Sequence, residues 1–176
     1  WNFTALSGVI LSEQCFRYEY DGRGRMIRKK VPGAGEVRMA YDARDRLALV
    51  QHSLQRIQSK WSYTQYDSLS RPYASGIWTD LGGRTFSQIL SQSDTSVGII
   101  SGGSFEELTV NYYGTYAWVT TPLSQSRLST WDSYLLPPDN STYPYPQASV
   151  KSNLVNGYVT GLKTKILGTS TFLYSV

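Results

Sequence analysis

The stretch Tyr20-Asp21-Gly22-Arg23-Gly24-Arg25 recurs twice along the chain. The later copies are Tyr41-Asp42-Ala43-Arg44-Asp45-Arg46 and Tyr66-Asp67-Ser68-Leu69-Ser70-Arg71. All three read Tyr-Asp-x-x-x-Arg, and their tyrosines are 21 and 25 residues apart. A pattern that returns at such a spacing is typical of repeat architectures in which each copy forms one supersecondary unit. We interpret Tyr113-Gly114-Thr115-Tyr116 as a fourth, degenerate copy that has lost its Asp.

Each copy predicts a β-hairpin with the turn at its centre. An extended run precedes every Tyr-Asp pair, and the run Glu36–Tyr41 alternates apolar and polar side chains as a strand does. Asp suits the first turn position because its side chain accepts hydrogen bonds from the backbone that follows. The fourth position is Gly24, Asp45 or Ser70. Gly and Asp tolerate the left-handed conformation that ends such turns, whereas Ser does so less readily, so the third turn is predicted to differ.

The arginine that closes each pattern returns the chain to its own Asp. An ion pair between the two would staple the turn, at about 0–1 kcal/mol for an exposed pair. We therefore assign a structural role to the repeated residues. They are Tyr20, Asp21, Arg25, Tyr41, Asp42, Arg46, Tyr66, Asp67 and Arg71.

The regular spacing of the Tyr-Asp-x-x-x-Arg repeat ends near residue 80. Polar residues 84–104 predict irregular structure, and Glu107 to Val119 predicts a β pair of Leu108–Tyr113 with Tyr116–Val119. Residues 120–150, rich in Ser, Thr, Pro and Tyr, predict a long loop. We therefore expect a single all-β domain over residues 1–176. Its parts would be repeat hairpins at about 14–80, an irregular insertion at about 84–150 and a final hairpin at about 157–176.

Composition supports a β protein and excludes little else. Tyr occurs 14 times, and aromatic side chains suit a pleated, half-buried surface. The formal net charge is +4, with 11 Lys and Arg against 6 Asp and Glu in residues 1–60, which is weaker than a nucleic-acid-binding domain normally shows. No apolar run is long enough for a membrane span. The chain starts at Trp1 without a signal peptide, so we interpret it as a piece of a longer protein.

The Tyr-Asp pattern, with Gly-Arg and an apolar pair after it, resembles the YD repeat of Rhs-type proteins, in particular the large Bacteroidetes ones. The resemblance covers about residues 14–80 well and the last twenty residues, with Val159–Gly168, adequately. It implies consecutive antiparallel hairpins stacked edge to edge into a curved sheet, here incompletely closed because the hairpins are too few for a full shell. It also implies a secreted or cell-surface protein whose shell scaffolds or encloses a variable effector region. The rest of the full-length chain would then be the main partner.

Catalysis and cofactor binding are not predicted. The three repeat carboxylates would be spread along one edge and bonded to their own turns, so they suit neither acid–base work nor a metal site. His52 is the only histidine and Cys15 the only cysteine, which leaves no His cluster and no internal disulfide. Cys15 is expected to be a small, half-buried strand residue and His52 a strand-end or loop residue, and no cofactor or metal is expected.

The aromatic residues carry the alternative function. Trp131, Tyr143 and Tyr145 lie in the polar loop and could stack on sugars, which would make the chain a carbohydrate-binding surface module. The strand aromatics are instead expected to pack the sheet face. These are Trp61, Tyr63, Tyr112 and Trp118. Stacked hairpins also leave two open sheet edges, so we expect edge pairing with a second copy or coverage by the 120–150 loop.

Overall fold

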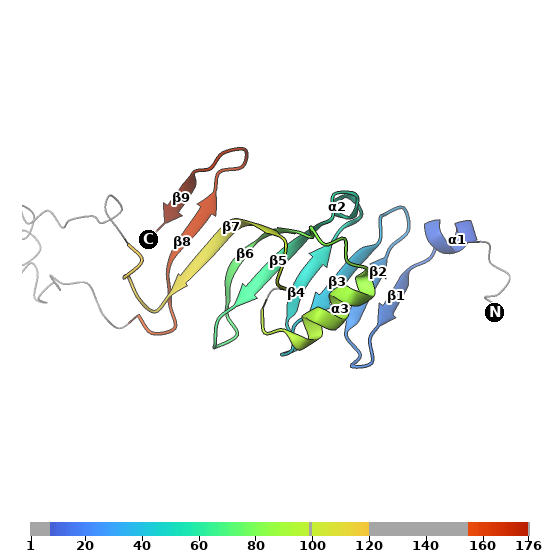
Figure 1. The fold of residues 1–176 in the computed structure, drawn as a ribbon, viewed down its shortest axis with the longest axis horizontal. Helices are drawn as coiled ribbons and strands as arrows, with labels where there is room; N and C mark the ends of the chain where they lie inside the picture. Colours follow the sequence, from blue (N-terminus) through green and yellow to red (C-terminus); the bar gives the residue numbers. More distant parts are fainter. Residues whose placement is uncertain (1–7, 99, 120–154, 176) are drawn as a thin grey trace, which may run out of the picture.

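The computed structural model describes residues 8–98, 100–119 and 155–175. In this part of the chain nine strands form one antiparallel sheet, and every strand pairs with its neighbour in sequence (Figure 1). The strands are β1 Arg17–Tyr20, β2 Met26–Lys30, β3 Val37–Tyr41, β4 Leu47–Gln51, β5 Lys60–Tyr66, β6 Pro72–Thr79, β7 Ser104–Tyr113, β8 Val159–Lys165 and β9 Phe172–Ser175. The prediction of an all-β fold of consecutive antiparallel hairpins is confirmed.

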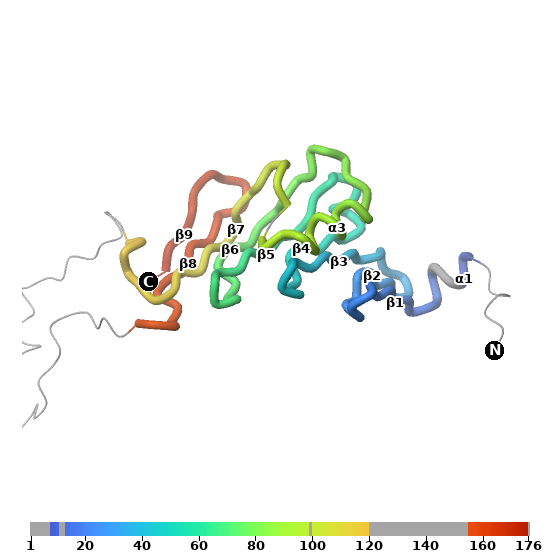
Figure 2. Tube along the Cα trace, turned by 60° about the horizontal axis from the view of Figure 1, so that its bottom comes forward, coloured from blue at the N-terminus to red at the C-terminus, as the bar shows by residue number. Residues whose placement is uncertain are grey.

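The sheet is open, as predicted for hairpins too few to close. Figure 2 shows it running from β1 to β9 without curling back on itself.

A β-bulge lies at the same point of four hairpins. The strand register shifts beside Tyr20, Tyr41, Tyr66 and Tyr113, in each case at the last residue before the turn. A bulge adds one residue to the opposite strand and increases the local twist. Because Tyr113 shows the same shift as the three clear copies, it occupies the tyrosine position of a fourth turn.

The predicted pairing of Leu108–Tyr113 with Tyr116–Val119 is wrong in its second half. The strand β7 pairs with β8, whose register places Tyr113 opposite Val159. The backbone N–H of Gly114 donates to the carbonyl of Tyr158 at 3.1 Å, so the chain leaves the hairpin after Gly114 and returns at residue 158. Residues 116–119 form a turn instead of a strand.

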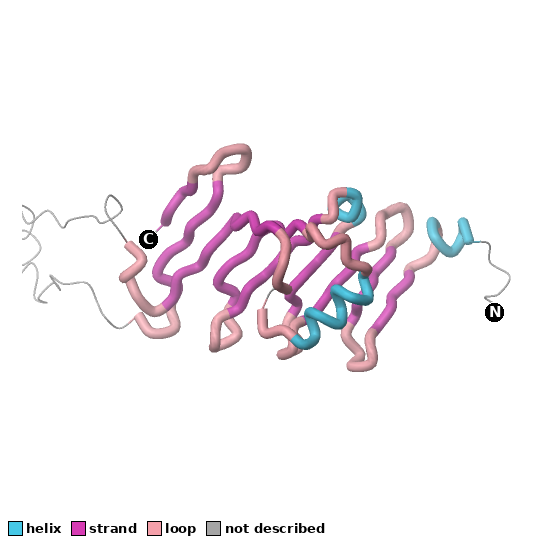
Figure 3. The backbone as a smooth tube through the Cα atoms, in the orientation of Figure 1, coloured by secondary structure: helices cyan, strands magenta, loops and turns pink. Residues whose placement is uncertain are grey.

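Among the described residues three helices accompany the sheet: α1 Gly8–Glu13, α2 Ser53–Ile57 and α3 Phe86–Thr95 (Figure 3). The helix α3 stands where the sequence predicted irregular structure. Its start is defined by Thr85, which accepts a hydrogen bond from the N–H of Gln88, while the Gln88 side chain accepts one from the N–H of Thr85. This reciprocal capping box satisfies backbone donors that the first helical turn leaves free.

The hydrophobic core lies between α3 and one face of the sheet. Phe86 and Ile89 of α3 meet aromatic and aliphatic side chains of β3 to β6. The buried core residues are Ala40, Ala48, Leu49, Trp61, Tyr63, Trp78, Phe86, Ile89 and Ile100. In Figure 1 the helix lies over the β3 region of the sheet and runs toward the Tyr-Asp turns at the lower margin.

Candidate functional site: the turn ladder

The three Tyr-Asp turns share one geometry. In each, Oδ1 of the Asp accepts two backbone N–H groups, two and four residues on, at 2.9–3.0 Å. The fourth residue is left-handed in all three, with φ of 77° at Gly24, 60° at Asp45 and 62° at Ser70. The expectation that the Ser70 turn differs is therefore wrong. The carboxylate bonds and the backbone bond from the fourth N–H to the Asp carbonyl, 3.0 Å in each turn, outweigh the reluctance of Ser.

The predicted ion pair is present in every turn. The arginine Nε donates to Oδ2 of the same Asp at 2.7 Å for Arg25, 2.8 Å for Arg46 and 2.7 Å for Arg71. The side chain of Asp42 is fully buried, so the small value expected for an exposed pair does not apply there. Burial raises the pKa of Asp42, but hydrogen bonds from Arg46 and from two backbone N–H groups outweigh it, and the net pKa is lowered.

Each arginine also reaches the next hairpin. The guanidinium carbon of Arg25 lies 5.2 Å from the ring centre of Tyr41, that of Arg46 lies 4.6 Å from Tyr66, and that of Arg71 lies 4.2 Å from Tyr113. These are cation–π distances. The sequence did not reveal these contacts because the intervals between the partners differ widely.

The tyrosine hydroxyls complete the same contact. Each donates to the backbone carbonyl of the residue after the stacked arginine, namely Met26, Leu47 and Pro72, at 2.9–3.0 Å. Arginine, carbonyl and tyrosine thus form a repeated unit, which we call the turn ladder. It extends to Tyr113, as the bulge at that residue does.

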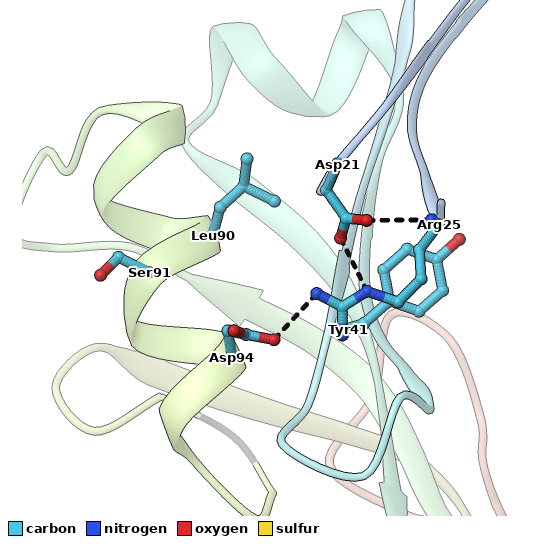
Figure 4. A pocket seen from close by; sticks show the side chains of 6 residues that line it. All are labelled: Asp21, Arg25, Tyr41, Leu90, Ser91 and Asp94. Atoms are coloured by element: carbon cyan, nitrogen blue, oxygen red, sulfur yellow. Dashed lines mark hydrogen bonds and ion pairs between the residues drawn. The ribbon is translucent and has the colours of Figure 1, made fainter. Parts of the chain in front are cut away.

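The helix α3 docks on the first two turns. Nη2 of Arg25 donates to Asp94 at 2.8 Å and Nη1 donates to Asp45 at 2.6 Å, while the N–H of Ala43 donates to the carbonyl of Ser96 at 3.0 Å. A cavity of about 190 Å³ remains between the helix and the turn, with Leu90 facing Asp21 and Arg25 across it (Figure 4).

A further turn of this kind follows β6. Asp80 accepts the backbone N–H groups of Gly82 and Arg84, its carboxylate pairs with the Arg84 guanidinium, and Gly83 has a φ of 61°. It lacks the tyrosine and leads into α3 instead of a strand. The sequence carries the Asp-x-x-x-Arg pattern here, Asp80-Leu81-Gly82-Gly83-Arg84, but no Tyr precedes it.

The carboxylates of the turn ladder are all hydrogen-bonded within it. Asp21, Asp42 and Asp67 each bond to their own turn and arginine. Among residues 8–98, 100–119 and 155–175, no group of three or more His, Cys, Asp or Glu could hold a metal ion. No helix in these ranges is long and apolar enough to cross a membrane.

Cys15 and His52, the one cysteine and the one histidine of the sequence, do not belong to the turn ladder. Cys15 is half-buried just before β1, so the expectation of a strand position misses by two residues. His52 is an exposed loop residue at the start of α2, as expected.

The strand aromatics pack as predicted. Trp61 and Tyr63 are each 4% exposed, and Tyr112 stacks on Trp118 with ring centres 4.2 Å apart. Trp118 itself lies in the turn after β7, against Gly161 of β8. The proposed sugar-stacking residues Trp131, Tyr143 and Tyr145 lie outside the described residues.

Comparison with family models, with curated proteins and with solved structures finds no match to this chain. The turn ladder is therefore the observation from which a function is argued.

Proposed function

We propose that this chain is a non-catalytic structural segment of a secreted or cell-surface YD-repeat protein of Rhs type. Its sheet would contribute to a β-shell that scaffolds or encloses an effector region of the longer protein. The observation that carries the proposal is the turn ladder, in which the arginine of one turn is held by its own Asp and by the tyrosine of the next turn.

The ladder suits an architectural role for a physical reason. In the described part of the chain each strand pairs only with its neighbours in sequence, so stability grows by the addition of similar units, as in other repeat proteins. The repeat side chains are consumed by these contacts. Arg46, for example, bonds to Asp42 and stacks on Tyr66, which leaves neither group free to act on a substrate.

The test uses the full-length parent protein. Arg46→Gln combined with Arg71→Gln removes two rungs of the ladder, and Arg44→Gln serves as the control because Arg44 is exposed and stacks on no described tyrosine. We expect the region downstream of this segment to be cut by protease at least about ten-fold faster in the double variant, since opening by about 1.4 kcal/mol raises the open population by that factor.

The control variant should match the wild type. Equal cleavage rates in wild type, control and double variant would show that the ladder encloses nothing. A parent protein with no region downstream of this segment would also contradict enclosure.

A further inference from the structure

An arginine cluster lies at the sheet margin opposite the turn ladder. Arg28 of β2, Arg38 of β3 and Arg56 of α2 gather near Phe86, the first residue of α3. The guanidinium carbons of Arg28 and Arg38 are both 5.0 Å from the centre of the Phe86 ring. Three cations are therefore held close together at the point where α3 begins.

The cluster holds more positive charge than its carboxylates balance. Oε1 of Glu36 accepts Nε of Arg38 at 3.0 Å and lies 3.3 Å from Nη2 of Arg56, so one carboxylate serves two guanidiniums. Arg28 pairs with Glu19, whose side chain is 57% exposed, at 3.1 Å. Burial first, and then the charges of Arg38 and Arg28, lower the pKa of Arg56 although Glu36 opposes them. The three guanidiniums of the cluster therefore face only two carboxylates, those of Glu36 and Glu19.

Two of its donors are also unsatisfied. The Nε atoms of Arg28 and Arg56 are buried and have no hydrogen-bond partner among the described residues. A buried donor without a partner costs on the order of 1–3 kcal/mol. Such atoms next to uncompensated charge call for an acceptor that is itself negative.

A cavity adjoins Arg38 and Arg56 of this cluster. It has a volume of about 160 Å³ and is lined by Arg38, Arg56, Ser59 and Arg84 among others. Since water occupies about 30 Å³ per molecule in the liquid, the space holds roughly five waters, or an oxyanion group with a few waters. Arg84 has its own carboxylate, Asp80, and also donates to the carbonyl of Ser101. Arg38 and Arg56 instead share the one carboxylate of Glu36, and Nη2 of Arg56 also donates to the Glu36 carbonyl at 2.8 Å.

We infer that this cavity binds an oxyanion group, a phosphate or a carboxylate, through Arg38 and Arg56. The planar guanidinium matches both groups with two parallel donors. The N-terminal end of α3, which starts at Phe86 on the cavity wall, adds the positive end of its dipole. The site does not depend on the proposed structural role, since it uses none of the ladder residues.

The experiment follows the Nε–Hε signals of the whole chain by NMR while inorganic phosphate or acetate replaces chloride at constant ionic strength. We expect saturable shifts of the Arg38 and Arg56 signals, because these two arginines line the cavity. Arg38→Gln should weaken binding at least about ten-fold, the factor that corresponds to about 1.4 kcal/mol. Arg44→Gln, which alters an exposed arginine of the second Tyr-Asp turn, should leave binding unchanged.

Two further comparisons keep the result decisive. Arg56→Lys retains the positive charge but lacks the two parallel donors of the guanidinium. The variant should therefore fold like the wild type but bind the anion more weakly. Saturation by phosphate alone assigns a phosphate ligand, and saturation by acetate as well assigns a carboxylate-tolerant site. Shifts that grow linearly, or that are equal in wild type, Arg38→Gln and Arg44→Gln, would overturn the inference.

Discussion

Asp42 is the most deeply held carboxylate of the turn ladder. Its side chain is fully buried and pairs with Arg46, whereas the side chain of Asp67 is 22% exposed and pairs with Arg71 in the same way. Asp42→Asn keeps an oxygen for the backbone but sets an amide against the guanidinium. We expect a loss of about 3 kcal/mol in the free energy of unfolding, because the arginine loses a buried partner.

Asp67→Asn makes the same chemical change nearer to water. Its expected cost is about 1 kcal/mol, as for exposed pairs. Urea titrations of both variants measure the difference. Equal losses would show that burial does not set the strength of these turns.

The turn carboxylates also make stability depend on acid. The net pKa values of Asp21, Asp42 and Asp67 are lowered: burial raises them, but hydrogen bonds from the turn backbone and from the turn arginine outweigh it. A lowered folded pKa gives stability that is present above the unfolded value of about 3.9 and lost as the pH falls through the folded value.

The unfolding free energy should therefore be level near neutral pH and fall below about pH 4. Denaturant titrations between neutral and acid pH measure this, with Asp42→Asn as the comparison. That variant should show a slope reduced by up to about 1.4 kcal/mol per pH unit, since one proton fewer is taken up on unfolding. An unchanged slope would contradict the linkage to Asp42.

Residue-scale features were predictable where they were local. The Asp–Arg ion pairs span four residues, so the pattern alone placed them. The left-handed Ser70 was missed because the bonds around it override its own preference. The contact of Arg71 with Tyr113 was missed because the two are 42 residues apart and meet only through strand register.

Between elements, the arginine–tyrosine contact is the feature to measure. The Arg71 and Tyr113 pair is the tightest, at 4.2 Å. A double-mutant cycle with Arg71→Gln and Tyr113→Leu should give a coupling energy of about 0.5–1 kcal/mol. The same cycle on Arg44 and Tyr113 should give a coupling energy of about zero. A coupling energy of zero for Arg71 and Tyr113 as well would show that the turn ladder does not stabilise the contact between hairpins.

The helix α3 is the element that sequence reasoning missed. Its buried residues are only Phe86, Ile89 and Ser93, so the apolar stripe is too thin to stand out among polar neighbours. Thr85 and Gln88 were nevertheless in capping-box spacing, a signal that was available. What fixes the helix is the apolar sheet face beneath it, which no local window of sequence contains.

Removal of single contacts should show where α3 draws its stability. Ile89→Ala should cost about 3 kcal/mol, since Ile89 is 1% exposed, and Thr85→Ala about 1 kcal/mol for the lost cap. Ser87→Ala, at an exposed position of the same helix, should change stability by less than about 0.5 kcal/mol. Thermal or urea unfolding measures all three, and an Ile89 loss no larger than the Ser87 loss would contradict the core assignment.

At the scale of the whole molecule, the serial strand order leaves β1 and β9 with one neighbour each in the described part of the chain. The β1 edge carries Arg17 and Glu19, whereas β9 carries no charged residue, and charges on an edge strand discourage pairing. We expect the isolated chain to self-associate through β9.

Sedimentation velocity over a concentration series measures this association. Leu173→Lys places a charge on β9 at a residue that is 64% exposed, and it should weaken the association. Leu69→Lys, at a 70% exposed turn position, is the matched control. A sedimentation coefficient that stays at the monomer value for the wild type would contradict edge pairing.

The order of β1 to β6 was predictable from the repeat, because short connections join these strands. The places of β7 and β8 were not set by local spacing, since α3 and a long connection after Tyr113 precede them.

The arginine–tyrosine contact gives the array a direction. Each of the three Tyr-Asp hairpins offers its arginine to the hairpin after it, and Tyr41, Tyr66 and Tyr113 each receive the arginine of the hairpin before, as the monomers of a head-to-tail polymer do. An in-frame duplication of residues 21–41 would therefore reproduce every junction: the new Arg would meet the Tyr that follows, and the new Tyr would meet the Arg that precedes. Genes for such arrays can lengthen by copying one unit without any compensating change in its neighbours.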